Sequence, residues 1–327
     1  MKNTNAGLIL RRNKEKRGKI MQFQWYPGHM TKARRMMEED IKLIDLVIEL
    51  VDARIPLSSR NPDIDKIGRN KARLILLNKC DLADEKKTKE WKGYFESKGY
   101  FAVMVNSRDG QGIKTINNVV KDACKEKIER DRKRGIKNRP VRAMVVGIPN
   151  VGKSTFINSY AKKACTKTGN KPGVTKGKQW IKLSSTLELL DTPGILWPKF
   201  EDQTVGLKLA FIGSIKDDII NTTELAMKLE KYLIKEYPGV LNARYSIEET
   251  DDFVKMLRDI AENRKFLLKG NEFNIDKAAI TLLDEFRSGK LGRISLETCE
   301  KDEKSKNEKF GNDEFKNDQS DIKDEIK

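Results

Sequence analysis

The chain has 327 residues, of which 38% are hydrophobic and 35% charged, and this length is enough for two ordinary domains with buried cores. No apolar run approaches the roughly 18 to 20 residues that a membrane-spanning helix needs, and the four cysteines lack the C-x-x-C spacing of zinc sites. The formal net charge of +17 favours a polyanionic partner, chiefly nucleic acid or ribosomes.

After a polar, basic stretch at 1–20, expected to be a flexible extension, strand-like runs alternate with charged stretches of helical character. Helices are predicted over 31–44, 85–98 and 113–134, and another begins at Lys153. Strands are predicted at 46–52, 74–77, 102–105, 141–146 and 187–190. Because strands that alternate with helices usually form a parallel sheet covered on both faces, this part is predicted to be an α/β domain.

Beyond about residue 216 the strand signals stop and amphipathic helical patterns replace them. These patterns cover 222–236, 247–266 and 276–287. They predict a second, all-α domain over residues 216–297. The tail, 298–327, is almost wholly charged or polar, and we expect it to be disordered because it has too few apolar side chains to bury.

A phosphate-binding loop is the most specific motif in the chain. Residues 147–154 read GIPNVGKS and match G-x-x-x-x-G-K-[ST], with a predicted strand before them and a predicted helix after. Backbone N–H groups of such a loop surround phosphate oxygens, the lysine reaches the β- and γ-phosphates, and the serine hydroxyl binds Mg²⁺. The predicted contacts to the phosphates and their cation are Asn150, Val151, Gly152, Lys153, Ser154 and Thr155.

A guanine-recognition motif, NKCD at residues 78–81, lies upstream of the phosphate loop, the reverse of the usual GTPase order. The Asp81 carboxylate can accept hydrogen bonds from N1–H and the 2-amino group of guanine, whereas adenine offers no such pair of donors. The motif ends a predicted strand, where open α/β sheets bind ligands. The predicted base-side residues are Asn78, Lys79, Asp81, Asn106 and Ser107.

A third motif, DTPG at residues 191–194, supplies the γ-phosphate side of the predicted site. Asp191 can hold Mg²⁺ through a water, and the Gly194 N–H can meet the γ-phosphate. Between the two phosphate motifs, Thr175 is predicted to be the switch threonine on Mg²⁺; the alternative for a lone loop threonine is a simple turn residue. The predicted cofactors are therefore GTP or GDP with Mg²⁺.

These motifs resemble those of the circularly permuted GTPases, and more closely those of the ribosome biogenesis GTPase A (YlqF-type) family. The resemblance covers residues 22 to about 297 and is carried by QWYPGHM at 24–30, VDARIP at 51–56, DTPGILWPKFED at 191–202 and LGRIS at 291–295. It implies a circularly permuted P-loop GTPase domain over 21–215, followed by a helical domain over 216–297 that binds RNA or the ribosome.

The nucleotide motifs do not themselves supply a residue that orients the attacking water, because Ile195 stands where many GTPases have a glutamine. The resemblance implies that His29, the one histidine of the chain, takes that role beside Lys153, Thr175 and Gly194; the alternative is that His29 caps or packs against the helix that follows it. Asn150 resembles the asparagine that coordinates potassium in several GTPases, and the alternative is a polar turn residue.

The resemblance implies a cytoplasmic GTPase, without stable membrane association, that binds a late precursor of the large ribosomal subunit and its rRNA; a monomer is the default expectation. GTP hydrolysis would drive maturation of the precursor and release of the protein. The alternatives are a GTP-binding RNA scaffold with little catalysis, a membrane-associated signalling switch, and an organellar version of the same factor suggested by residues 1–20.

A basic stretch at 121–142 is the sequence feature that best fits an RNA partner. The stretch has ten Lys and Arg against four Asp and Glu. We expect it to contact phosphates, although charge runs are often only solvated helix faces and a Lys- and Asn-rich composition can reflect genome bias.

Overall fold

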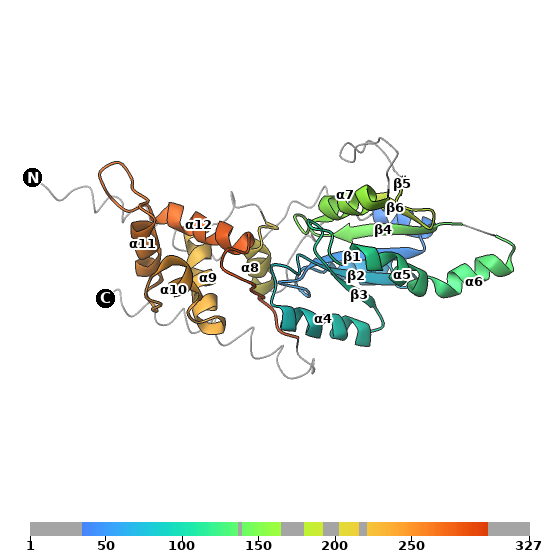
Figure 1. Ribbon diagram of the computed structural model, residues 1–327, viewed down its shortest axis with the longest axis horizontal. Helices are drawn as coiled ribbons and strands as arrows, with labels where there is room; N and C mark the ends of the chain where they lie inside the picture. The colour runs from blue at the N-terminus through green and yellow to red at the C-terminus, as the bar shows by residue number, and fades with distance from the viewer. Residues whose placement is uncertain (1–34, 137–138, 165–179, 192–202, 216–220, 300–327) are drawn as a thin grey trace, which may run out of the picture.

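The computed structural model describes residues 35–136, 139–164, 180–191, 203–215 and 221–299 (Figure 1). An α/β part, blue to green in Figure 1, lies beside a helical part coloured orange to red. Within the described ranges, no helix combines the length and the apolarity that crossing a bilayer requires.

A six-stranded sheet with the order β3-β2-β1-β4-β6-β5 forms the centre of the α/β part. All neighbouring strands run parallel except β5, which is antiparallel to β6. The strands are β1 (Leu46–Asp52), β2 (Ala72–Asn78), β3 (Phe101–Val105), β4 (Val141–Gly147), β5 (Trp180–Lys182) and β6 (Leu187–Asp191). The central strand β1 is buried at every position, as expected for a parallel strand covered on both faces.

Successive side chains of β1 enter opposite faces of the sheet, because the side-chain period of a strand is two. Leu46, Ile48 and Leu50 belong to one apolar cluster, whereas Val51 belongs to another on the opposite face. Around the sheet lie η1 (Ile41–Leu43), which continues a helical stretch at 35–40, and the helices α3 (Pro62–Ile67), α4 (Glu85–Ser97), α5 (Ile113–Ala123), α6 (Lys125–Lys133) and α7 (Lys153–Ala164). Apolar residues of α5 and α7 join the first cluster, and Trp91 of α4 joins the second.

The helical part packs its apolar faces around one another and contains no strand among its described residues. Its helices are α9 (Thr222–Glu236), α10 (Val240–Tyr245), α11 (Phe253–Asn263) and α12 (Ile275–Arg287), and α8 (Gln203–Phe211) lies between them and the sheet. Asn221, Asp252 and Asn274 cap the starts of α9, α11 and α12 through their side chains.

After α12 the chain returns to the α/β part. The Ile294 N–H donates to the Leu82 carbonyl at 3.0 Å, and the Leu296 N–H donates to the Arg54 carbonyl at 2.8 Å. The Glu297 carboxylate accepts hydrogen bonds from the backbone N–H groups of Leu57 and Ser58. These contacts fix the end of the helical part against the loop that follows β1.

The predicted fold class is confirmed, and several predicted elements differ in detail. The single helix expected over 113–134 is wrong: Cys124, with ψ 14°, leaves the helical region and separates α5 from α6. The helix expected from 247 begins at Phe253, because the Asp252 side chain caps it there. The elements α3, α8, α10 and β5 were not predicted from the sequence; β5 has only three residues, too few to show alternation. The domain limits stay a prediction.

Candidate nucleotide-binding site

The phosphate-binding loop joins β4 to α7 at the carboxyl edge of the sheet. A Cβ on Gly147 would lie 2.8 Å from the Leu50 carbonyl oxygen, so the loop leaves β4 at a distance that only glycine permits. Gly152 has φ +98°, and a Cβ there would lie 2.5 Å from Nδ2 of Asn78. Both motif glycines therefore have a steric reason in this fold.

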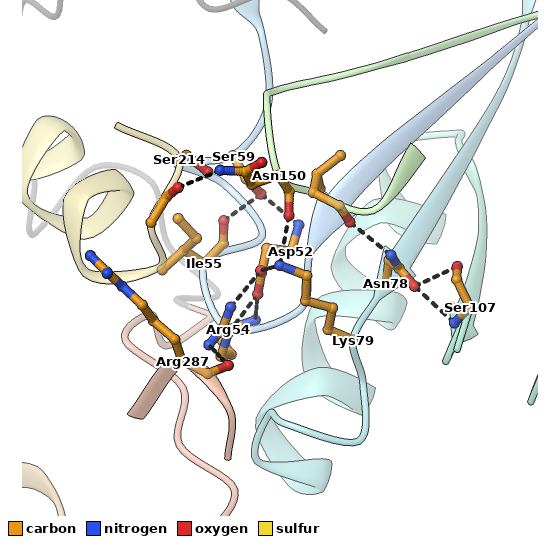
Figure 2. A network of polar contacts seen from close by, with 12 residues as sticks. Asp52, Arg54, Ile55, Ser59, Asn78, Lys79, Ser107, Asn150, Ser214 and Arg287 are labelled. Carbon is orange, nitrogen blue, oxygen red and sulfur yellow. Dashed lines mark hydrogen bonds and ion pairs between the residues drawn. The ribbon is translucent and has the colours of Figure 1, made fainter. Parts of the chain in front are cut away.

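Asn78 ties the phosphate loop to two other loops, as Figure 2 shows. Its Nδ2 donates to the Val151 carbonyl at 2.7 Å. Its Oδ1 accepts from the backbone N–H of Ser107 at 3.1 Å and from the Ser107 hydroxyl at 2.7 Å. One buried amide thus fixes the loops after β2, β3 and β4 relative to one another, so the loops that carry the predicted base-side and phosphate-side residues lie next to each other.

Lys79 follows with φ +59°, a left-handed conformation that costs free energy for a residue with a side chain. Its Nζ donates to the Asn150 carbonyl at 2.8 Å and lies 3.0 Å from a carboxylate oxygen of Asp52. The lysine therefore connects the predicted guanine motif directly to the predicted phosphate loop.

Asp81 and Asn106 have different environments. Asp81 is half-buried and has no hydrogen bond or ion pair with any other described residue. Asn106 is buried; its Nδ2 donates to Asp109 at 2.9 Å and its Oδ1 accepts from the Arg108 N–H at 3.0 Å. Asn106 thus shapes the loop that presents Ser107.

The predicted Mg²⁺ ligands are only partly described. Ser154 is exposed in the first turn of α7, and Asp191 ends β6, where its backbone pairs with Val145 of β4. A serine hydroxyl and an aspartate carboxylate are hard oxygen donors of the type Mg²⁺ prefers, so these residue types fit the cation. His29, Thr175 and Gly194 lie outside the described residues.

The Asn150 side chain makes a hydrogen bond that could not be predicted from the sequence. With φ +60°, its Nδ2 donates to the Gly213 carbonyl at 2.7 Å, just after α8. Next to it, the Ser214 hydroxyl donates to the Pro149 carbonyl at 3.0 Å. The phosphate loop is thereby attached to the segment that leads toward the helical part.

Asp52 and Arg54 lie behind the site. In the sequence they belong to the VDARIP motif, which did not indicate their contact with each other. Asp52 and Arg54 are both fully buried and form a bidentate ion pair, with Nε–Oδ1 at 2.9 Å and Nη2–Oδ2 at 2.8 Å. Burial by itself would raise the pKa of Asp52, but the charges of Arg54 and Lys79 outweigh it and hold that pKa well below its usual range.

A phosphate loop fixed to an upstream N-K-x-D loop defines a P-loop GTPase of permuted motif order. A family profile described as "50S ribosome-binding GTPase" matches residues 142–269, which begin after the N-K-x-D motif. The chain is 52% identical over 282 residues to "Ribosome biogenesis GTPase A" of Bacillus cereus, covering 86% of this chain and 95% of the relative. The chain belongs to the ribosome biogenesis GTPase A family.

Solved structures agree with this assignment. A GDP-bound structure of TM YlqF matches with a TM-score of 0.60 at 28% identity, covering 81% of this chain and 99% of that one. A GNP-bound YlqF from Thermotoga maritima matches with a TM-score of 0.57 at 28% identity, covering 82% of this chain and 98% of that one.

Proposed function

We propose that the chain binds a late precursor of the large ribosomal subunit in its GTP form and that GTP hydrolysis drives maturation of the precursor and release of the protein. Family membership supports the GTPase activity and the role in ribosome assembly. The observation that carries the nucleotide assignment is the Asn78 amide, which holds the base-side and phosphate-side loops together. The protein would act as a cytoplasmic monomer without stable membrane association.

In this proposal each described motif residue has one task in the attack of water on the γ-phosphate. Asp81 accepts hydrogen bonds from guanine, and Lys153 reaches the β- and γ-phosphates. Mg²⁺, held by Ser154 and, through a water, by Asp191, would neutralise charge on the phosphates.

Three residues outside the described ranges complete the proposed reaction. Thr175 would add a hydroxyl to the metal, Gly194 would donate its N–H to the γ-phosphate, and His29 would orient the attacking water in place of the side chain that Ile195 cannot provide.

Coordination of potassium by Asn150 is part of the proposal. Its Nδ2 already donates to the Gly213 carbonyl, so another atom of the side chain must bind the cation. The Oδ1 atom of the same amide is the group that would coordinate K⁺. The cation would add positive charge next to the phosphates as negative charge develops there. Equal hydrolysis rates in potassium and sodium buffers would remove this role.

The basic surface at α6 supports contact with rRNA. Helix α6 buries none of its side chains fully and projects from the α/β part in Figure 1. Lys127 ties α6 to the sheet through an ion pair with Asp45 at 3.0 Å, and it also pairs with Asp131 of the same helix at 2.9 Å, whereas other cations of α6 face solvent. The exposed cations are Lys125, Arg130, Arg132, Lys133 and Arg134.

The helical part has no comparable excess of positive charge. Residues 221–299 contain thirteen Lys and Arg against fourteen Asp and Glu. If this part also binds RNA, as the family suggests, shape and local hydrogen bonds must contribute more there than net charge. We therefore expect α6 to account for much of the salt dependence of ribosome binding.

Nucleotide specificity tests the site assignment. Asp81→Asn replaces a carboxylate acceptor by an amide that can donate to a carbonyl, so we expect it to weaken GTP binding and to favour xanthosine triphosphate, whose base carries a carbonyl at C2. Asp122→Asn, at an exposed position of α5, is the matched control and should leave base preference unchanged. Unchanged preference for GTP in Asp81→Asn would contradict the assignment.

A further inference from the structure

A buried ion pair, Asp52 with Arg54, lies behind the predicted guanine loop. The Asp52 carboxylate accepts only charge-assisted or backbone hydrogen bonds: Arg54 supplies its Nε, Nη2 and backbone N–H, the last at 3.1 Å from Oδ1. Lys79 Nζ supplies the remaining contact, 3.0 Å from Oδ2 (Figure 2). The carboxylate therefore lies between a fixed arginine and the lysine of the guanine motif.

The contact with Asp52 determines where the Lys79 ammonium can point. Lys79 is 24% exposed, and its backbone adopts φ +59°, so its position is set by contacts rather than by local preference. The ammonium reaches Asp52 on one side and the Asn150 carbonyl, at 2.8 Å, on the other. Loss of the Asp52 charge would leave the lysine with a single described anchor.

The far end of Arg54 touches the helical part. Its Nη1 donates at 3.3 Å to the carbonyl of Arg287, the last residue of α12, and its guanidinium lies 5.4 Å from the centroid of the Phe286 ring. Arg287 in turn donates from Nε to the Phe211 carbonyl at 3.0 Å and from Nη2 to the Ala210 carbonyl at 2.9 Å. The two arginines thus join the loop after β1, the end of α12 and the end of α8.

The residues that follow α8 contact the phosphate loop again. Gly213, which follows α8, accepts from Asn150 Nδ2, and Ser214 donates to Pro149. The Asn150 carbonyl is also the acceptor of the Lys79 ammonium. A closed circuit of polar contacts therefore runs from the guanine loop through the helical part and back to the phosphate loop.

A buried ion pair is weak evidence for stability, because desolvation of both ions offsets much of their attraction. Its directional donors and acceptors, however, can hold a third and a fourth group in place, which apolar side chains cannot do. We propose that Asp52 and Arg54 are positioning residues that hold Lys79 against the phosphate loop. Through them, guanine-nucleotide affinity would depend on how the end of α12 packs against Arg54. This inference rests on the proposed assignment of residues 78–81 to guanine.

Removal of Arg54 should make the contact between Asp52 and Lys79 sensitive to pH. In the described part of the chain, the charged groups facing Asp52 are Arg54 and Lys79. With both present, the pKa of Asp52 stays well below its usual range although burial opposes ionisation. Removing the Arg54 charge leaves burial opposed by one cation only, so the carboxyl should take up a proton at mildly acidic pH and release Lys79.

The test is equilibrium binding of fluorescent N-methylanthraniloyl-GDP to the full chain, with kcat for GTP measured at saturation. We expect Asp52→Asn to raise Kd about tenfold with kcat little changed, because no reacting group is altered. Arg54→Met should show a Kd that rises more steeply than that of wild type from pH 8 to pH 5.5. Arg54→Lys, which restores the charge, should return the pH profile to that of wild type.

Two further variants separate positioning from general stability. Arg60→Met removes another arginine of the same loop, one that pairs with Glu49 at 3.1 Å and Asp65 at 2.6 Å, and should lower the melting temperature without changing Kd. Arg287 lies outside the nucleotide loops. Arg287→Met removes the bonds that hold the end of α12 to the Phe211 and Ala210 carbonyls, and it should raise Kd several-fold if nucleotide affinity depends on the position of α12.

Three outcomes would overturn the proposal. Asp52→Asn with wild-type Kd would show that the pair is structural only, and wild-type Kd in Arg287→Met would remove the dependence on α12. Unchanged binding in Asp81→Ala would show instead that the guanine assignment itself is wrong, independently of the polar circuit. None of these measurements needs ribosomes, so a failure of the proposed ribosomal role would not affect them.

Discussion

Asn78→Ala is the substitution that most directly tests how the site is built. The amide makes three buried hydrogen bonds, to the Val151 carbonyl at 2.7 Å and to the N–H and hydroxyl of Ser107 at 3.1 and 2.7 Å. Each contributes about 1 kcal/mol net, and the Val151 carbonyl and Ser107 N–H would be left without that partner. We expect a loss on the order of 3 kcal/mol in the free energy of unfolding, out of a typical ~5–15 kcal/mol.

Nucleotide affinity should fall with the stability, because the three loops would no longer share an anchor. The assay combines urea unfolding with titration of fluorescent GDP. The matched control is Asn263→Ala, whose Nδ2 donates to the Tyr245 carbonyl at 3.0 Å far from the site; it should cost about 1 kcal/mol and leave Kd unchanged. An Asn78→Ala protein that binds GDP as wild type does would refute the reasoning.

Three further predictions concern Gly152 of the phosphate loop and the buried glutamates Glu230 and Glu297. Gly152→Ala, with φ +98° and a Cβ 2.5 Å from Asn78 Nδ2, should abolish measurable GDP binding in the same titration. Burial raises the pKa of Glu230 to about 9, so stability should fall as pH rises from about 4.5 toward 9. At about 1.4 kcal/mol per pKa unit, Glu230→Gln should gain on the order of 5 kcal/mol at pH 8 in urea unfolding and flatten the pH profile. Glu297→Ala leaves the Ser58 N–H without its carboxylate and should expose the segment after α12 to limited proteolysis, with a loss of ~2 kcal/mol.

The fold and the two nucleotide motifs could be predicted because each depends on local sequence. Strand-sized apolar runs ending in NKCD and GIPNVGKS place both motifs at the carboxyl edge of one parallel sheet, whatever the order of the strands in the chain. The sheet pairing of β1 with both β2 and β4 then brings Asn78 next to Val151.

The polar circuit behind the site could not be predicted, because its members are distant in sequence. Arg54 and Arg287 are 233 residues apart, and no periodic pattern links them. Asp52 was assigned to the end of a strand, where a buried carboxylate has no signature without its partners. The break at Cys124 was missed for a different reason, since the charged sequence around it favours a continuous helix and the turn depends on tertiary packing.

The net charge illustrates a further limit of sequence composition. An excess of +17 predicts a polyanionic partner but not where it binds. The described helical residues are nearly neutral, whereas five exposed cations lie on or next to α6, at the opposite end of the molecule in Figure 1. A charge-reversal variant at Arg130 and Lys133 should therefore reduce the salt slope of ribosome binding, by roughly one for each phosphate that the variant no longer neutralises.

The most direct test of the account is GTP hydrolysis by the purified protein in potassium buffer, alone and with separated ribosomal subunits. We predict strong stimulation by the large subunit and none by the small one. Tight GTP binding without stimulation by either subunit would contradict the proposed role and favour a non-catalytic RNA scaffold.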